Sequence, residues 1–136
     1  MRRLLTLAVA ACICGQAHAD PDDFRCFVSI GHQPPIRLEI EFTNANAGYV
    51  TYEHGHGRIP VALTDDKSAP SPRDRPGEAT MRWREDATVG AGGEYVMTSE
   101  GARVADFRYI RNKDGKIFRF EEDLQASGEN ACTWNK

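Results

Sequence analysis

VADFRYIRNKDGKIFRFEEDL, residues 104–124, is the stretch that decides the fold class. Two runs of alternating apolar and polar residues flank Asp114 and Gly115, a pair that supplies the positive φ angles of a tight type I′ hairpin turn. A slip of one residue would put aromatic side chains opposite charged ones, so the hydrophobic pattern selects a two-residue loop. The expected cross-strand pairs are Lys113–Lys116, Tyr109–Phe120 and Arg108–Glu121. The stretch therefore predicts a half-buried antiparallel sheet.

Similar alternation recurs along the chain in short runs separated by turn residues, as in residues 36–43, where every second residue is apolar. In residues 24–30 the apolar face is expected to hold Phe24, Cys26, Val28 and Ile30. Besides the hairpin, the expected strands are residues 24–30, 36–43, 49–53, 58–63, 79–85, 94–99 and 131–134. No segment has a convincing helical period. The sequence thus predicts an all-β fold, a small antiparallel up-and-down meander of about eight strands.

Residues 1–19 have the features of a secretory signal peptide. Two arginines precede a short apolar run, and an Ala-His-Ala site ends at Ala19, so the mature chain is expected to begin near Asp20. The protein is then periplasmic or secreted, with residues 20–136 as a single β-barrel domain. The alternative is an outer-membrane lipoprotein, because the residues before Cys12 resemble a lipobox. No other segment is apolar enough to be a transmembrane helix.

Two cysteines, Cys26 and Cys132, follow the signal peptide. In an oxidising compartment a disulfide is the simplest expectation for two cysteines in a small domain. Closing a loop of about a hundred residues is worth on the order of 4–5 kcal/mol in the chain-entropy model. A bond between the first strand and the chain end, together with the removal of open sheet edges, favours a closed barrel over a sandwich.

The charge of the mature chain argues against nucleic acid or anionic lipid as the natural partner. Without Arg2 and Arg3 there are fifteen basic and twenty acidic side chains, a formal charge of −5. The arginines are interleaved with acidic residues, so no basic stripe is expected. No motif implies a cofactor.

Three histidines are candidates for metal chemistry: His32, His54 and His56. His54 and His56 would share one face of a strand, an arrangement that some metal sites use. Both lie among glycines at a turn, however, so solvated side chains are the preferred interpretation. The glycine-rich residues 90–93 precede a strand, whereas a phosphate site needs a helix start, so a flexible hairpin loop is expected there.

Residues 64–78, TDDKSAPSPRDRPGE, have no periodicity, three prolines and no large apolar residue. The sequence predicts a loop here, and a connection of this length in a compact domain is usually functional or disordered. A rigid sheet that displays one long proline-bearing loop is suited to protein recognition. The charged tip, Arg73, Asp74 and Arg75, is the leading candidate binding site, with His54 and His56 as secondary candidates.

A barrel of about eight strands is either filled by its own side chains or holds one small ligand. The bulk of Phe107, Phe118, Phe120, Met81 and Trp83 favours a packed core. A lipocalin-like cavity for a small hydrophobic ligand remains the alternative.

The layout of the chain resembles that of secreted bacterial lysozyme inhibitors of the membrane-bound or periplasmic C-type class. The shared features are a signal peptide, a small β-meander, a cysteine on the first strand and another near the chain end. The likeness is architectural, because no stretch matches the Ser-Gly-rich inhibitory motif of that family, and no functional residue is carried over.

The first hypothesis is a non-catalytic β-domain that binds or inhibits another protein, such as an envelope hydrolase or toxin. The alternatives are a lipocalin-like carrier of a small hydrophobic ligand and a metal-dependent enzyme that uses the three histidines.

Overall fold

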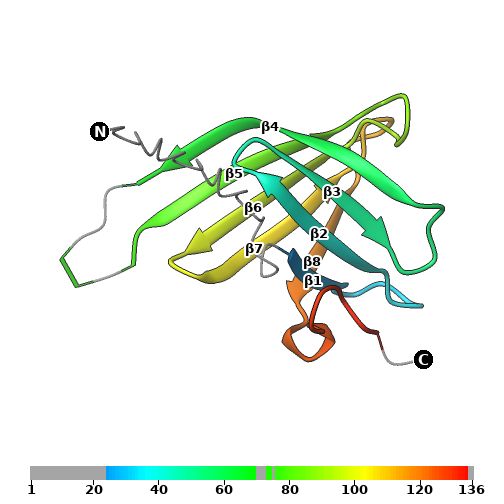
Figure 1. Ribbon diagram of the computed structural model, residues 1–136. Helices are drawn as coiled ribbons and strands as arrows, with labels where there is room; N and C mark the ends of the chain where they lie inside the picture. Colours follow the sequence, from blue (N-terminus) through cyan, green and yellow to red (C-terminus); the bar gives the residue numbers. More distant parts are fainter. Residues whose placement is uncertain (1–23, 70–72, 75, 135–136) are drawn as a thin grey trace, which may run out of the picture.

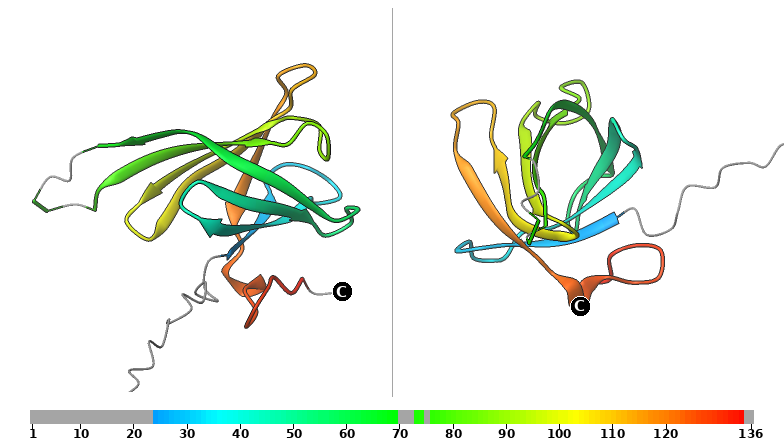
Figure 2. Two further views of the ribbon diagram at one scale, coloured as in Figure 1. Left: turned by 45° about the horizontal axis from the view of Figure 1, so that its top comes forward. Right: turned by 90° about the vertical axis from the view of Figure 1, so that its left-hand side faces the viewer.

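The computed structural model describes residues 24–69, 73–74 and 76–134, in which eight antiparallel strands close into an up-and-down barrel. Each strand pairs with its neighbours in sequence and β8 pairs with β1, so the strands form a ring (Figures 1 and 2). The all-β meander and its closure into a barrel are confirmed. The elements are β1 Phe24–Ser29, β2 Arg37–Asn44, β3 Ala47–Tyr52, β4 Arg58–Ser68, β5 Glu78–Glu85, β6 Glu94–Glu100, β7 Arg103–Ile110, β8 Ile117–Glu122 and the 3-10 helix η1 Leu124–Ala126.

Within these described ranges, no helix is both long enough and apolar enough to cross a membrane.

Alternate residues of every strand fill the middle of the barrel. The rings of Phe27 and Phe107 stack with their centroids 4.0 Å apart, and the Tyr95 ring is also stacked with Phe107, at 5.9 Å. The buried core cluster comprises Phe27, Leu38, Ile40, Val50, Val61, Trp83, Tyr95, Met97, Phe107 and Phe120. Where the sequence assigns an apolar face to a strand, these residues match it, except in the first strand. The sequence assigns no face to residues 49–53, of which Val50 lies in the core.

The apolar face predicted for β1 is wrong. Phe27 is fully buried in the core, which puts Cys26 and Val28 on the outer side of the strand. The run carries apolar residues on both faces, so alternation could not choose between them. Cys26 is nevertheless only 2% exposed, and its disulfide to Cys132, with a Cα–Cα distance of 5.7 Å, is the one predicted.

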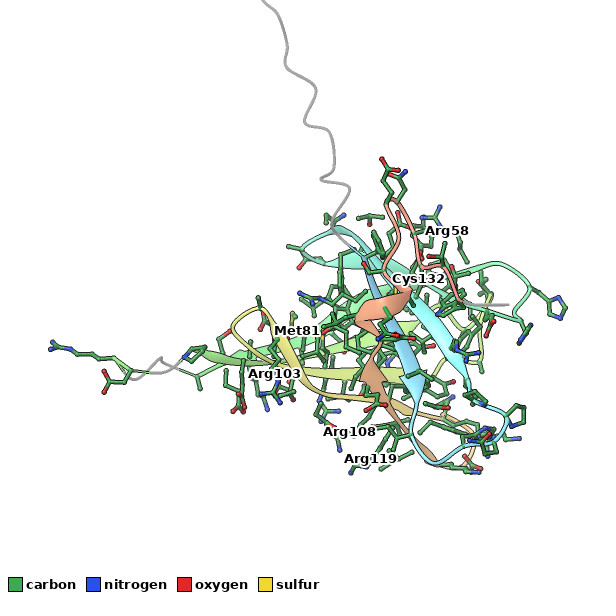
Figure 3. The ribbon with its side chains drawn as sticks, turned by 90° about the horizontal axis from the view of Figure 1, so that it is seen from below. Arg58, Met81, Arg103, Arg108, Arg119 and Cys132 are labelled. Carbon is green, nitrogen blue, oxygen red and sulfur yellow. A yellow bond between two sulfur atoms is a disulfide. The ribbon has the colours of Figure 1, made fainter. Side chains whose placement is uncertain are left out.

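The C-terminal residues do not form the ninth strand expected at residues 131–134. After η1, a single antiparallel bridge joins Ser127 to Cys132, and the Cys132 N–H donates to Glu39 Oε2 at 2.6 Å. The disulfide and this hydrogen bond attach the segment to the outside of β1 and β2; Figure 3 labels Cys132 there.

The hairpin of β7 and β8 keeps the predicted faces but not the predicted register. The observed pairs are Phe107–Phe120, Arg108–Arg119, Tyr109–Phe118 and Ile110–Ile117, two residues from expectation. The loop is longer because Arg111 binds Asp114 through two contacts, Nε–Oδ1 at 2.9 Å and Nη2–Oδ2 at 2.6 Å. Gly115 takes the positive φ, 69°, while Asp114 does not. A shift of two preserves the faces, so the hydrophobic pattern could not detect it.

The predicted loop over residues 64–78 is partly strand. β4 continues to Ser68 and β5 begins at Glu78, so the two pair from Asp65–Arg82 to Ser68–Ala79. We call this extension, residues 64–69 with 76–82 and the tip between them, the arm; it projects past the rest of the barrel wall (Figure 1). The β4 part of the arm is largely exposed, so its strand carries no apolar alternation.

Candidate functional site

The up-and-down topology gives the barrel two ends with different connections. We call the end that carries the β2–β3 turn, the arm and the β6–β7 turn the mouth. We call the other end, which carries residues 30–36, 53–57, 86–93 and 111–116, the closed end.

The structure does not bring the candidate site residues together. Arg73 and Asp74 are exposed in the tip of the arm, on the mouth side, and Arg75 lies outside the described residues. His54 and His56 are exposed in the β3–β4 turn, at the closed end. Cys12 and the predicted signal peptide, residues 1–19, also lie outside the described residues.

His54 has an 88% exposed side chain, and its Nε2 lies 3.7 Å from the carboxylate of Glu53. His32, in the β1–β2 connection, has its Nδ1 2.8 Å from the Pro34 carbonyl oxygen. In the part of the chain that the structure describes, no group of three or more His, Cys, Asp or Glu side chains has an arrangement that could hold a metal.

The closed end contains a buried carboxylate that the sequence did not single out. Glu85, at the end of β5, is 5% exposed. Its Oε1 accepts a hydrogen bond from the Tyr95 hydroxyl at 2.7 Å, and its Oε2 accepts from the N–H groups of Ala91 at 3.0 Å and Gly93 at 3.4 Å. The Tyr95 hydroxyl donates its only proton to Glu85. The Tyr52 hydroxyl, 2.6 Å from that of Tyr95, therefore acts as the donor to Tyr95.

The glycine-rich residues 90–93 supply the backbone N–H groups that donate to the Glu85 carboxylate. Gly92 and Gly93 are buried, and a Cβ at Gly93 would overlap the ring of Tyr109. A Cβ at Gly90 would lie 2.7 Å from Ile59 and 2.8 Å from the Glu85 carboxylate. Glycine is therefore required for the loop to fold this closely over the barrel. The loop does present amides to an anion, but the anion is a side chain of the same protein.

Burial keeps the phenol groups of Tyr52 and Tyr95 protonated. Desolvation raises the pKa of Tyr52 and of Tyr95 well above the ordinary phenol value, and the charge of Glu85 adds to both shifts. Both phenols keep their protons at neutral pH, so the hydroxyl of Tyr52 donates a hydrogen bond to Tyr95 and that of Tyr95 donates one to Glu85. The polar groups of the closed end are thus paired with one another.

The mouth contains a recess of about 520 Å³. Its wall is mainly apolar and comes from β1, β2, β5 and β6: Phe24, Phe42, Ala79, Met81, Trp83 and Met97. In Figure 3 Met81 lies on the side from which the arm extends. The expectation that side chains fill the interior thus holds for the middle of the barrel and the closed end, but not for the mouth.

Two of the residues that line the recess, Trp83 and Arg25, carry hydrogen-bond donors. Trp83 is 1% exposed, and its Nε1–H has no hydrogen-bond acceptor among the described residues. A buried donor without an acceptor is uncommon and costs about 1–3 kcal/mol. Arg25 also lines the recess, with Nη1 2.7 Å from Glu122 Oε1.

The outer face of β5 to β8 carries arginines that align across strands but are paired with carboxylates. Arg82, Val96, Arg108 and Arg119 occupy one cross-strand row. Val96 is fully buried although it faces outward, so the arginine stems on either side cover it.

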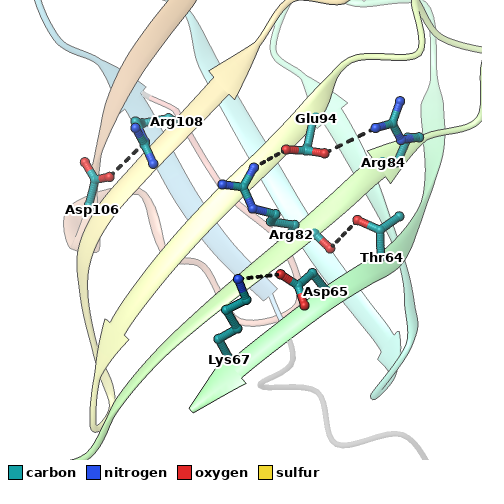
Figure 4. A network of polar contacts seen from close by, with 8 residues as sticks. All are labelled: Thr64, Asp65, Lys67, Arg82, Arg84, Glu94, Asp106 and Arg108. Carbon is teal, nitrogen blue, oxygen red and sulfur yellow. Dashed lines mark hydrogen bonds and ion pairs between the residues drawn. The ribbon is translucent and has the colours of Figure 1, made fainter. Parts of the chain in front are cut away.

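Glu94 pairs with both Arg82 and Arg84, and Asp106 pairs with Arg108 (Figure 4). Asp106 also pairs with Arg119. These ion pairs leave the outer face less available to an anionic partner than its arginine count suggests.

The chain matches no protein-family model, and no curated protein or solved structure matches it either.

Proposed function

We propose that the protein is a non-catalytic binding module that captures or inhibits another protein through its arm. The observation that carries this proposal is the free edge of β4. The pairing of β3 with β4 ends at Ala47–Ala62, followed by one hydrogen bond from Leu63 N–H to Asn46 O. From Thr64 to Ser68, β5 is the only strand paired with β4 in the described chain.

The direction of the free backbone groups follows from the ladder. Ala69 N–H donates to Glu78 O, so the N–H and C=O groups of residues 69, 67 and 65 point toward β5. Those of Asp66 and Ser68 point away, where an extended segment of a partner can add a strand. Asp65, Asp66 and Lys67 place charges along the edge, which disfavours indiscriminate pairing and selects a complementary partner.

Residues 1–19 support a periplasmic or secreted location, which makes an envelope hydrolase or toxin a suitable target class. An outer-membrane lipoprotein anchored at Cys12 is the alternative. The mass of the protein isolated from its own cells distinguishes a chain that begins at Asp20 from an acylated one that begins at Cys12.

The test is affinity capture from the native envelope fraction with four immobilised chains. These are the intact mature chain, Asp66→Pro, Asp66→Ala, and a chain in which Asn-Gly replaces residues 70–77. Proline at position 66 removes an N–H that points away from β5, so it blocks strand addition and leaves the β4–β5 ladder intact. Alanine removes the side chain but keeps the N–H.

We expect Asp66→Pro to lose a partner that Asp66→Ala retains. Loss in the Asn-Gly chain alone would assign the contact to the tip with Arg73 and Asp74. Equal capture by all four chains would contradict the proposal.

A further inference from the structure

We propose that the recess at the mouth binds the aliphatic chain of a single-chain carboxylate, as found in a free fatty acid. This site goes beyond protein capture by the arm and does not depend on it. Three properties of the recess support the assignment: its size, its apolar wall and the sign of its polar groups.

The size and the wall fit an aliphatic body. A volume of about 520 Å³ lies within the range of small-molecule sites, about 300–1,000 Å³. Two fully or nearly fully buried side chains, Trp83 and Met97, form part of the wall, and Phe42 and Met81 pack against the same core. Phe42 and Trp83 are in contact, with ring centroids 5.2 Å apart. The recess is therefore bounded by core side chains that are already held in place.

The polar groups of the recess fit an anionic acceptor. Among the described residues that line the recess, Arg25 is the one charged side chain, and its Nη1 lies 2.7 Å from Glu122 Oε1.

Arg25 is oriented before any ligand arrives. Its contact with Glu122 uses one of five guanidinium donors, and its side chain is 34% exposed. A carboxylate at the rim can bind the remaining donors with charge-assisted hydrogen bonds. The geometry thus favours a carboxylate over a neutral head group of the same chain length.

The chain offers an internal reporter for this site. It has two tryptophans, and in a Trp134→Phe variant Trp83 is the only one left. We expect titration of the mature Trp134→Phe chain with monomeric dodecanoate to change Trp83 emission saturably, at one ligand per chain. Dodecanol should bind at least roughly tenfold more weakly, since hydrogen bonds to charged groups are the stronger ones. Acetate should produce no change.

Three further variants, one of them a control, locate the site. In the same Trp134→Phe background, Ala79→Phe fills the recess without adding charge and should abolish the response. Arg25→Met should remove the preference for dodecanoate over dodecanol, whereas Arg119→Met, which removes an ion-paired arginine on the outer face, should leave both affinities unchanged. Circular dichroism and the intact disulfide verify folding.

If Arg25→Met does not fold, the comparison of dodecanoate with dodecanol on the parent chain still tests the head-group preference. A response that does not saturate, equal affinities for the two ligands, or full binding by Ala79→Phe would each overturn the proposal. The Asn-Gly arm variant should bind dodecanoate normally, so a failure of protein capture and a failure of this site can be told apart.

Discussion

The closed end and the mouth are built from the same eight strands, but they differ in which polar groups find partners. At the closed end, Glu85 accepts hydrogen bonds from Tyr95 and from two backbone amides, and the Tyr52 hydroxyl donates to that of Tyr95. At the mouth, side chains leave a recess of about 520 Å³, and in the described residues β4 leaves backbone groups unpaired along the arm. Paired polar groups are therefore concentrated at the closed end, and unpaired backbone groups at the mouth.

The connections cause this difference. A short glycine-rich loop folds back over the closed end, where Gly93 lies directly against Tyr109. The arm extends away from the mouth, but its Ala79 and Met81 line the recess, and its Gly77 carbonyl accepts a hydrogen bond from Gly101 N–H in the β6–β7 turn. A barrel of this size can be filled or can hold a ligand. Here side chains fill the closed end, and the mouth contains the recess.

The largest effect that we expect comes from removing the buried carboxylate. Glu85→Ala leaves a hydroxyl and two amides without their acceptor and opens a cavity, which should lower the free energy of unfolding by about 3 kcal/mol. Denaturant unfolding measures this change. Glu78→Ala, an exposed carboxylate at the mouth end of the same strand, should change it by less than about 0.5 kcal/mol. Equal effects at the two positions would remove the contrast between the two ends.

Gly93→Ala should lower the free energy of unfolding by about 2 kcal/mol, within the range for overpacking. The added Cβ overlaps the Tyr109 ring, so the loop or the ring must move. Thermal unfolding measures the loss, and Ala91→Ser, at an exposed position in the same loop, is the control. A fully stable Gly93→Ala protein would show that the loop is not held against the barrel.

Alkaline pH should destabilise the closed end. The pKa values of Tyr52 and Tyr95 are raised in the folded state, so above pH 10.0 the unfolded chain loses phenol protons that the folded chain retains. The contribution of each phenol is complete below pH 10 and is lost as the pH rises toward its folded pKa, at up to about 1.4 kcal/mol per pH unit.

Urea unfolding between pH 9 and 11 tests this expectation. Tyr95→Phe, although less stable at pH 9, should show a shallower decline. Constant stability of the intact chain to pH 11 would contradict burial of these phenols.

The smallest effect concerns the arm. Asp66→Pro should change the free energy of unfolding by less than about 0.5 kcal/mol, because the lost N–H points away from β5. Lys67→Pro, one residue on, removes an N–H of the β4–β5 ladder and should cost more. Chemical denaturation of the two variants checks the assignment, and the reverse order would mean that β4 has a different register.

The fold was predictable because it rests on alternation that most strands share. In β5, for example, Met81 and Trp83 lie on the same face of the strand, and this apolar face identifies the side that points into the barrel. β1 was ambiguous because Cys26, Phe27 and Val28 are consecutive apolar residues, and only the covering C-terminal segment explains the buried outer cysteine. The β7–β8 register depended on the Arg111–Asp114 pair, a side-chain interaction that hydrophobic alternation does not reveal.

The candidate site was less predictable, since it depends on contacts between distant elements. Glu85 could have been noticed as a charged residue in phase with Met81 and Trp83, followed by a glycine-rich loop that could supply amides. Nothing local distinguishes the arm of β4 from a loop, since a strand exposed on both faces has no hydrophobic period. The recess depends on that extension, because Ala79 and Met81 of the arm form part of its wall.

Hydrogen exchange of individual amides, measured by NMR on the oxidised mature chain, tests the contrast between the two ends most directly. We expect the amide of Gly93 and, to a lesser extent, that of Ala91 to exchange slowly although they belong to a loop, because they donate to Glu85. We expect the amides of Asp66 and Ser68 to exchange rapidly although they belong to a strand, because they point away from β5. Rapid exchange at Gly93 together with protection at Asp66 and Ser68 would contradict the account.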